Sequence, residues 1–173
     1  MARRTLAATT SRSGVGLHTG AQTTVHLAPG APGLGIRFQR ADLPGQPMVS
    51  ARVAQVDATE RRTGLADGAT SVQTVEHLLA ALFALQVDDC LITLDGPEPP
   101  ILDGSFRPWL ELIEAVGVEG REGEPAVLRV TTPFAVEEGD ARYVVAPAAG
   151  FQVTATIEWP HPVIGRQSAS FLV

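Results

Sequence analysis

The sequence predicts an α+β protein in two units, a first unit that combines strands with helices and a second unit of strands alone. Three features of the 173 residues predict this class. Short segments that alternate apolar and polar residues, as half-buried strands do, occur in the N-terminal part. Two helical patterns follow between residues 70 and 116, and a polar segment at 119–125 separates them from further strand patterns. Hydrophobic residues make up 45% of the chain, which allows a substantial core.

The N-terminal part is expected to form short strands joined by loops. The segment QTTVHL alternates and is rich in β-branched residues, and IRFQR alternates in the same way. Three glycines and two prolines between them indicate a loop. In chain order, the predicted elements are a strand before Gly14, a strand at 22–27, a loop at 28–35, a strand at 36–40, a short strand at about 51–56 and a loop at about 61–68.

The segment 70–85 carries the strongest helical pattern, and no glycine or proline interrupts it. Two starts are open, a capping box of Thr70 with Gln73 or a shorter helix capped by Thr74. The apolar residues follow the i, i+3, i+4, i+7 spacing of an amphipathic helix at Val75, Leu78, Leu79 and Leu82.

A strand at 87–94 and a turn-rich loop at 95–104 lead to a second predicted helix at 106–116. Ser105 is its expected N-cap, and Gly117 its expected end.

A polar linker is expected at 119–125 (EGREGEP), and no helix is expected beyond residue 117. A sheet with one open face normally needs a helical layer or a second sheet to cover it, so the second unit looks unfinished. Its predicted strands, with a hairpin turn at 137–140, lie at 126–130, 134–137, 142–146 and 151–158.

The bulk properties exclude several classes of protein. The formal net charge is -6 and no basic stripe is present, so nucleic acid is not expected as a partner. No apolar run reaches the roughly 20 residues of a membrane helix, and the basic N-terminus lacks the apolar segment of a secretory signal. We therefore expect a cytoplasmic protein without an integral membrane segment. The single cysteine, Cys90, cannot form an internal disulfide and is expected to be a buried strand residue.

Glu76 and His77 are the first candidates for chemistry. They fall in the early turns of the predicted helix, where neighbouring residues point about 100° apart. A zinc amidase needs neutral imidazole ligands and a nearby carboxylate that takes a proton from water. A helix N-terminus favours a carboxylate and disfavours a protonated histidine, which suits both roles. The spacing alone favours the alternative of a solvated helix start, because no His-Glu-x-x-His motif is present.

His18, Asp103 and Trp159 each have a functional and a structural interpretation. The glycine-bracketed turn around His18 lets a backbone approach a ligand closely, or it forms a tight hairpin. Asp103 can orient a catalytic group, or it can cap the following helix. Trp159 can stack on a base ring or belong to the core. Taken one by one, all three favour the structural interpretation.

Three segments occur together in an order that resembles one family. They are 14–20 (GVGLHTG), 74–82 (TVEHLLAAL) and 96–105 (GPEPPILDGS). Together they closely resemble UDP-3-O-acyl-N-acetylglucosamine deacetylase, the zinc enzyme of lipid A biosynthesis, over about residues 5–173. Each segment alone is a modest signal, whereas three in this order and spacing are a strong one.

The resemblance implies two similar α+β domains, each a sheet with a helical layer, with the active site where they meet. Residues 1–120 correspond to a complete two-layer domain, and residues 125–173 to the opening strands of the second domain. The implied reaction is zinc-dependent hydrolysis of the acetamide of UDP-3-O-acyl-N-acetylglucosamine, which releases acetate. We expect the complete enzyme to be a monomer.

The resemblance also implies roles at the reaction centre. His77 matches a zinc ligand, and Glu76 matches the general base that activates the zinc-bound water. Asp103 matches a loop aspartate beside the site, in a supporting role. The segment 63–65 aligns approximately with a segment near the metal and receives no role.

Substrate binding is implied near the C-terminal end of the sequence. Glu158 and Trp159 align with a strand end associated with uridine binding, where the aromatic ring can stack on uracil. His161 matches the histidine of the family's His-Pro step, and it joins His18 as a substrate-binding candidate.

The chain departs from the family pattern after His77. Two further zinc ligands of the family, a histidine and an aspartate four residues later, come from the second domain, as does a histidine general acid. No His-x-x-x-Asp pair follows His77 here, and a catalytic zinc needs three protein ligands. We therefore expect the chain to be the N-terminal part of the enzyme and inactive alone. The alternatives are a non-catalytic, truncated or degenerate paralogue that binds a UDP-sugar, and a metal site completed between chains.

Overall fold

The computed structural model describes residues 2–172, which divide into two compact units. The first unit extends to Pro125, and the second begins at Ala126. The first unit combines two α-helices with three sheets, and the second contains strands. The predicted α+β class is confirmed, whereas a second domain similar to the first stays a prediction.

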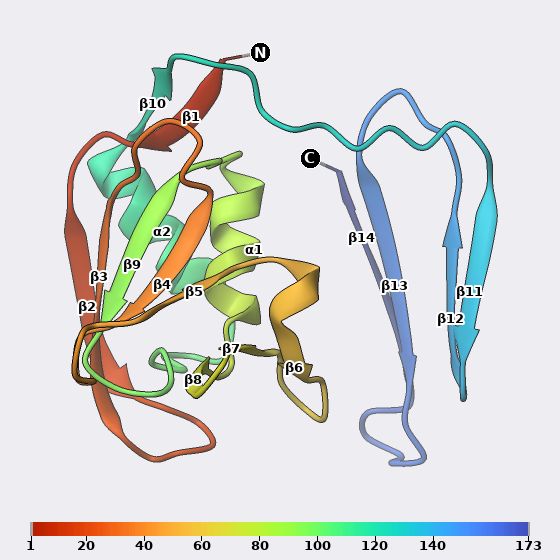
Figure 1. The fold of residues 1–173 in the computed structure, drawn as a ribbon. Coiled ribbons are helices and arrows are strands. Elements are labelled where there is room, and N and C mark those ends of the chain that lie inside the picture. Colours follow the sequence, from red (N-terminus) through yellow and green to blue (C-terminus); the bar gives the residue numbers. More distant parts are fainter. Residues whose placement is uncertain (1, 173) are drawn as a thin grey trace. The chain divides into compact units, whose positions relative to one another are not determined.

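The centre of the first unit is a five-stranded sheet (Figure 1). The parallel pair β4–β9 lies among antiparallel neighbours, because the chain crosses over through a helix before it returns as β9. In spatial order the strands are β2 (Thr10–Val15), β3 (Gln22–Pro29), β9 (Cys90–Leu94), β4 (Ile36–Arg40) and β5 (Met48–Ser50).

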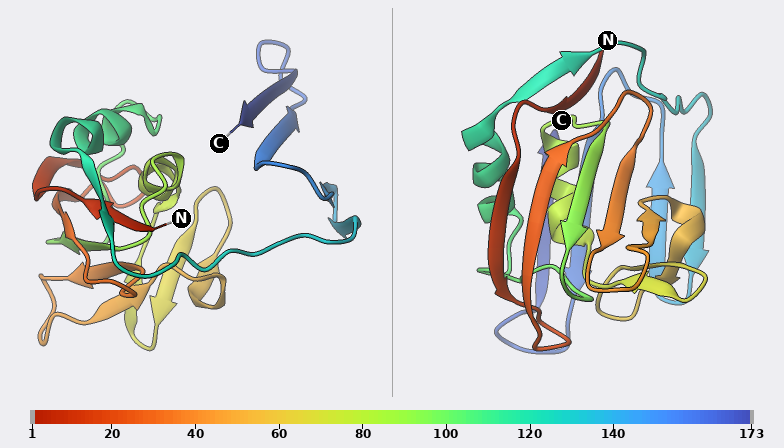
Figure 2. Two further views of the ribbon diagram at one scale, coloured as in Figure 1. Left: turned by 90° about the horizontal axis from the view of Figure 1, so that it is seen from above. Right: turned by 60° about the vertical axis from the view of Figure 1, so that its left-hand side comes forward.

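Two helices, α1 (Glu76–Ala84) and α2 (Arg107–Val116), lie together on one side of this sheet (Figure 2). Alternate residues of the inner strands point at them, as the two-residue period of a strand requires. One hydrophobic cluster joins the two layers. Its largest buried apolar side chains include Trp109, Ile113, Leu78, Leu82, Phe38, Leu27, Ile92 and Leu94.

A small antiparallel sheet replaces the pattern expected between residues 51 and 72. It contains β6 (Val56–Ala58), β7 (Gly64–Asp67) and β8 (Thr70–Val72). The strand expected at about 51–56 is instead a 3-10 turn, η1 (Val53–Gln55), and the loop expected at about 61–68 contains β7. Both expectations were wrong because segments of three or four residues are too short to show the alternation of apolar and polar residues that identifies a strand.

Helix α1 begins at Glu76 rather than at Thr70. Thr70 pairs with Asp67 in the β7–β8 hairpin, so the residues that were assigned to the first helical turns are extended. Thr74 has a φ of 53°, which breaks the helical path just before the capping position at Val75. Neither the predicted capping box of Thr70 with Gln73 nor the predicted cap by Thr74 forms. The N-cap residue is Val75, and no side chain donates or accepts a capping hydrogen bond there.

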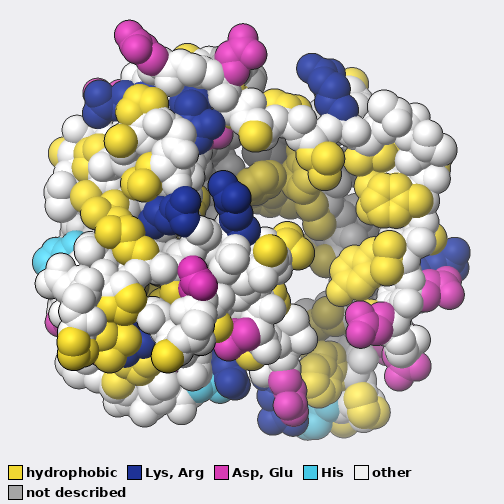
Figure 3. Space-filling view, in the orientation of Figure 1, with side chains coloured by type: hydrophobic (Ala, Val, Ile, Leu, Met, Phe, Trp, Pro, Cys, Tyr) yellow, Lys and Arg dark blue, Asp and Glu magenta, His cyan; other side chains and the backbone are white. Residues whose placement is uncertain are grey.

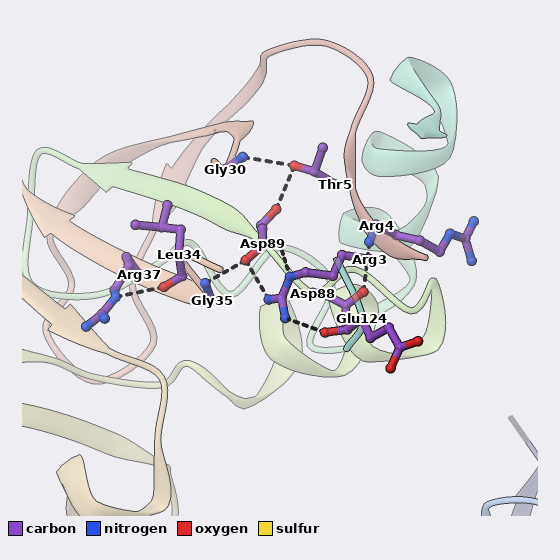
Figure 4. A network of polar contacts seen from close by, with 10 residues as sticks. All are labelled: Arg3, Arg4, Thr5, Gly30, Leu34, Gly35, Arg37, Asp88, Asp89 and Glu124. Atoms are coloured by element: carbon purple, nitrogen blue, oxygen red, sulfur yellow. Dashed lines mark hydrogen bonds and ion pairs between the residues drawn. The ribbon is translucent and has the colours of Figure 1, made fainter. Parts of the chain in front are cut away.

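The predicted polar linker is a strand in its first half. Residues Val118–Arg121 form β10, which pairs antiparallel with β1 (Arg3–Leu6) after Gly117 ends α2 with a φ of 80°. Arg3 of β1 then contacts Asp89 through its Nε and Nη2 atoms, each at 2.7 Å (Figure 4). This ion pair fastens the N-terminal strand to the start of β9.

The second unit contains two antiparallel hairpins. They are formed by β11 (Phe134–Glu138) with β12 (Ala141–Val145) and by β13 (Gln152–Glu158) with β14 (Arg166–Leu172). The strand expected at 126–130 is absent from this described segment. Many of the unit's hydrophobic side chains are exposed (Figure 3). Within residues 2–172, no helix combines the length and apolar character that crossing a bilayer requires.

Candidate functional site

Glu76 is the first residue of α1, and its carboxylate is held by the backbone of a neighbouring hairpin. The Thr63 amide donates a hydrogen bond of 2.9 Å to Glu76 Oε2. In return, the Thr63 carbonyl accepts a hydrogen bond of 3.2 Å from the Val75 amide. A negative charge at this position also faces the positive end of the helix dipole. The segment 63–65, which received no role from the sequence, therefore lies directly beside Glu76.

His77 follows on the same helical turn. Its Nε2 atom lies 3.9 Å from Glu76 Oε1, the carboxylate oxygen that Thr63 does not contact. The side chains of His77 and Glu76 are 26% and 36% exposed, so both can reach a ligand. The structure thus brings together an imidazole that can bind a metal and a carboxylate that can accept a proton.

Glu98 is a buried carboxylate to which sequence reasoning assigned no role. It is 0% exposed and lies in the Pro-rich loop between β9 and α2. Its oxygens accept hydrogen bonds from the Thr74 hydroxyl at 2.6 Å and from the Thr19 amide and hydroxyl at 2.8 Å each. The His18 amide donates a longer, shared bond of 3.1 Å. The one local signal for this residue is a lone acidic side chain between prolines.

These donors keep Glu98 ionised. Burial raises the pKa of its carboxyl group, but the hydroxyl of Thr74 and the donors of Thr19 and His18 outweigh burial, and the pKa is lowered overall. Gly16 belongs to the same arrangement. A Cβ atom at Gly16 would lie 2.5 Å from Glu98 Oε2, so the turn approaches the carboxylate only because this residue is glycine.

His18 and Asp103 are placed by backbone turns. The His18 side chain is exposed, while its amide faces Glu98. Asp103 Oδ1 accepts hydrogen bonds of 2.9 Å from the Ser105 amide and hydroxyl, and these bonds lower the pKa of Asp103. The Ser105 hydroxyl in turn accepts a bond of 3.2 Å from the Arg107 amide. The contacts of Asp103 are thus those of a residue that shapes the start of α2.

Comparison with known proteins gives a consistent match over the whole chain. The protein-family model of LpxC, UDP-3-O-acyl N-acetylglycosamine deacetylase, matches residues 3–173. A curated UDP-3-O-acyl-N-acetylglucosamine deacetylase from Thermosynechococcus vestitus is 44% identical over 169 residues, which cover 98% of this chain and 59% of the relative. One from Methylococcus capsulatus is 40% identical over 166 residues, which cover 96% of this chain and 55% of the relative.

The chain belongs to the UDP-3-O-acyl N-acetylglycosamine deacetylase family. It spans less than two thirds of the length of these curated relatives.

The described part of this deacetylase-family chain offers a metal ion only part of a site. Among residues 2–172, no three His, Cys, Asp or Glu side chains gather as a metal ion would require. His77, with Glu76 beside it, provides one imidazole that could bind a metal, whereas a catalytic zinc needs three protein ligands. Cys90 is buried in β9, and burial raises the pKa of its thiol to about 12, which disfavours the thiolate form that binds metals.

The remaining candidates of this family member lie together in one turn of the second unit. Glu158 ends β13 opposite Arg166, and the Trp159 amide donates a bond of 3.0 Å to the Gly165 carbonyl. The His161 carbonyl accepts a bond of 2.8 Å from the Gly165 amide. The Trp159 side chain is 54% exposed, which leaves its ring accessible to a stacking partner.

Proposed function

We propose that the protein acts as a deacetylase on UDP-3-O-acyl-N-acetylglucosamine, in lipid A biosynthesis and in the cytoplasm. The observation that carries the proposal is the Glu76 carboxylate at the start of α1, with Thr63 on one oxygen and His77 beside the other. Membership of the deacetylase family supports it, and so do the names of the relatives.

In this proposal Glu76 acts as the general base. Its Oε1 atom makes no hydrogen bond to Thr63, so it can accept a proton from water. The water oxygen bonds to the acetamide carbonyl carbon, and the bond from that carbon to nitrogen then breaks. The proton that Glu76 took from water passes to the amine nitrogen, and the second water proton leaves with the carboxyl group, which ionises to acetate and gives that proton to the amine or the solvent.

Zinc dependence is part of the same proposal. A bound zinc ion polarises a carbonyl group and lowers the pKa of water. His77 is the ligand that we assign to it. Because the described residues do not gather three ligands, we assign the others to parts of the protein outside these 173 residues, and no step above is derived through the metal.

Substrate binding is assigned to the candidates that the chemistry favours. The exposed ring of Trp159 can stack on uracil, with Glu158 and His161 in the same turn. His18, whose side chain is exposed in the turn between β2 and β3, is a further substrate-binding candidate. Asp103 supports the site through the loop that it shapes. We propose a monomer as the active form.

Acetate release tests the proposal. The protein expressed from its complete natural reading frame, loaded with zinc, is expected to convert UDP-3-O-acyl-N-acetylglucosamine to the free amine, as followed by mass spectrometry. A chelator should remove the activity, and added zinc should restore it. If the loaded protein binds the UDP-sugar without releasing acetate, the non-catalytic alternative replaces this proposal.

A further inference from the structure

One carboxylate connects two parts of the candidate site that are far apart in sequence. Glu98 Oε1 accepts the Thr74 hydroxyl at 2.6 Å, and Glu98 Oε2 accepts the Thr19 amide at 2.8 Å. Thr19 follows His18 in the turn between β2 and β3, and Thr74 lies two residues before Glu76. Both segments are therefore fixed to the same buried group.

The contact to Thr74 determines where Glu76 lies. Thr74 has a φ of 53°, in the left-handed region that a β-branched residue rarely adopts. Its hydroxyl bond to Glu98 holds this conformation just before the helix. From there the Val75 amide reaches the Thr63 carbonyl, and the Thr63 amide reaches the Glu76 carboxylate. A change at Thr74 can thus reach Glu76 through one backbone hydrogen bond, from Val75 to Thr63, and one from the Thr63 amide to the Glu76 carboxylate.

An ionised carboxylate suits this position better than a neutral amide. A carboxylate only accepts hydrogen bonds, and all the groups around Glu98 can point donors at it. Within residues 2–172, no arginine forms an ion pair with Glu98, so these donors alone stabilise its charge.

We infer that Glu98 is a positioning residue, an assignment that rests on the proposed function. It sets the orientation of Glu76 through Thr74 and the position of His18 through the Thr19 turn, and it does not itself touch the substrate.

The test removes one hydroxyl and keeps the shape of the side chain. In the zinc-loaded protein from the complete reading frame, Thr74→Val is expected to lower kcat at least tenfold, with KM within about threefold and zinc content unchanged. Thr74→Ser keeps the donor and should stay within about threefold of the wild-type kcat. The matched control is Thr5→Val. Thr5 is also buried, and its hydroxyl donates to the Asp89 carbonyl at 2.7 Å and accepts from the Gly30 amide at 2.9 Å, away from Glu76.

If Thr5→Val lost as much kcat as Thr74→Val, the loss would come from general destabilisation by removing a buried hydroxyl, and the inference would be overturned. Normal turnover in Thr74→Val would overturn it as well. If Thr74→Val does not fold, Thr74→Ala replaces it in the same comparison.

Amide resonances separate this inference from the proposed function. In NMR spectra, Thr74→Val should shift the amide signals of both Thr63 and His18, neither of which touches the Thr74 hydroxyl, whereas Thr5→Val should leave them in place. If the wild type is inactive but Thr74→Val still shifts both amide signals, the deacetylase proposal alone is contradicted. If the wild type is active but Thr74→Val shifts neither signal, the role of Glu98 alone is contradicted.

Discussion

The backbone amide of Thr63 donates a hydrogen bond of 2.9 Å to the Glu76 carboxylate, which fixes one oxygen and leaves the other on the side of His77. A backbone donor is hard to displace, because Thr63 is itself bonded to Val75 through its carbonyl. The hydrogen bond therefore orients the carboxylate without neutralising it, as a group that must accept a proton requires.

Glu76→Gln is expected to lower kcat by about 10²–10⁴, the range that general bases contribute. The amide oxygen can still accept from Thr63, so the fold and the zinc content should stay as in the wild type. Steady-state kinetics with metal analysis checks this. The control is Glu111→Gln, which removes an exposed charge on α2, where Glu111 pairs with Arg107. Near-normal turnover of Glu76→Gln would remove Glu76 from the reaction.

His77→Ala is expected to lose bound zinc rather than to slow a zinc-loaded enzyme. The proposal makes this imidazole a zinc ligand, and among residues 2–172 no cluster of three metal-binding side chains could take its place, so its loss should leave zinc with too few donors. Zinc content after dialysis, measured by mass spectrometry, is the readout. His26→Ala removes an exposed histidine of β3 and should keep the metal. Full zinc occupancy in His77→Ala would exclude His77 as a ligand.

The layers of the first unit could be predicted from local patterns, whereas the region before α1 could not. The alternation of buried and exposed residues in β3, and the apolar stripe of α2 that ends at Gly117, can each be seen within the segment itself. In Thr70–Val72, by contrast, no local pattern distinguishes the strand from the helix that follows. The break depends on Thr74, whose conformation is held by a residue 24 positions later, Glu98. A one-dimensional period does not contain such a contact.

The candidate site could be predicted in part for the same reason. Glu76 and His77 are neighbours in sequence, so their chemistry is visible in a short motif. The role of Glu98 depends on the turn at Thr19 and on Thr74, which only the folded chain brings to it. Thr63 acts through its backbone, and a side-chain pattern carries no information on that.

Gly16→Ala is expected to destabilise the protein by about 1–3 kcal/mol, as overpacking of a well-packed site does. The added Cβ would lie 2.5 Å from Glu98 Oε2 and 2.7 Å from Thr19 Oγ1, so the carboxylate or the turn must move. Urea unfolding measures the loss. Gly150→Ala is the control, because no atom lies within 4 Å of the Cβ that it would add. Equal stability of the two variants would show that the Gly16 turn tolerates displacement.

Cys90 is expected to be unreactive toward thiol reagents while the chain is folded. Burial raises the pKa of its thiol to about 12, so at about pH 8 the reactive thiolate is roughly 10³-fold scarcer than for a free cysteine. The rate of disulfide exchange with a chromogenic reagent, with and without denaturant, checks this. Rapid reaction without denaturant would show that β9 opens easily.

Asp89→Asn is expected to lower the free energy of unfolding by about 3 kcal/mol at neutral pH, because it leaves the Arg3 guanidinium largely buried beside a neutral partner. Asp67→Asn, in the exposed β7–β8 turn, is the control and should change stability little.

The pH dependence separates the charge of Asp89 from its packing. Burial raises the pKa of Asp89, but the hydrogen bond from Arg3 and those from the Gly35 and Gly33 amides outweigh burial, and the folded-state pKa is lowered. The unfolded chain therefore binds the proton first as the pH falls. The contribution of Asp89 is complete above about pH 4, near the pKa of an unfolded aspartate, and is lost as the pH falls through the lowered folded-state pKa. The free energy of unfolding of the wild type, measured with urea, should fall steeply as the pH drops through this acidic range. That of Asp89→Asn should fall less steeply with pH, and the two values should meet at low pH. Parallel curves would mean that Asp89 acts through shape and not through its charge.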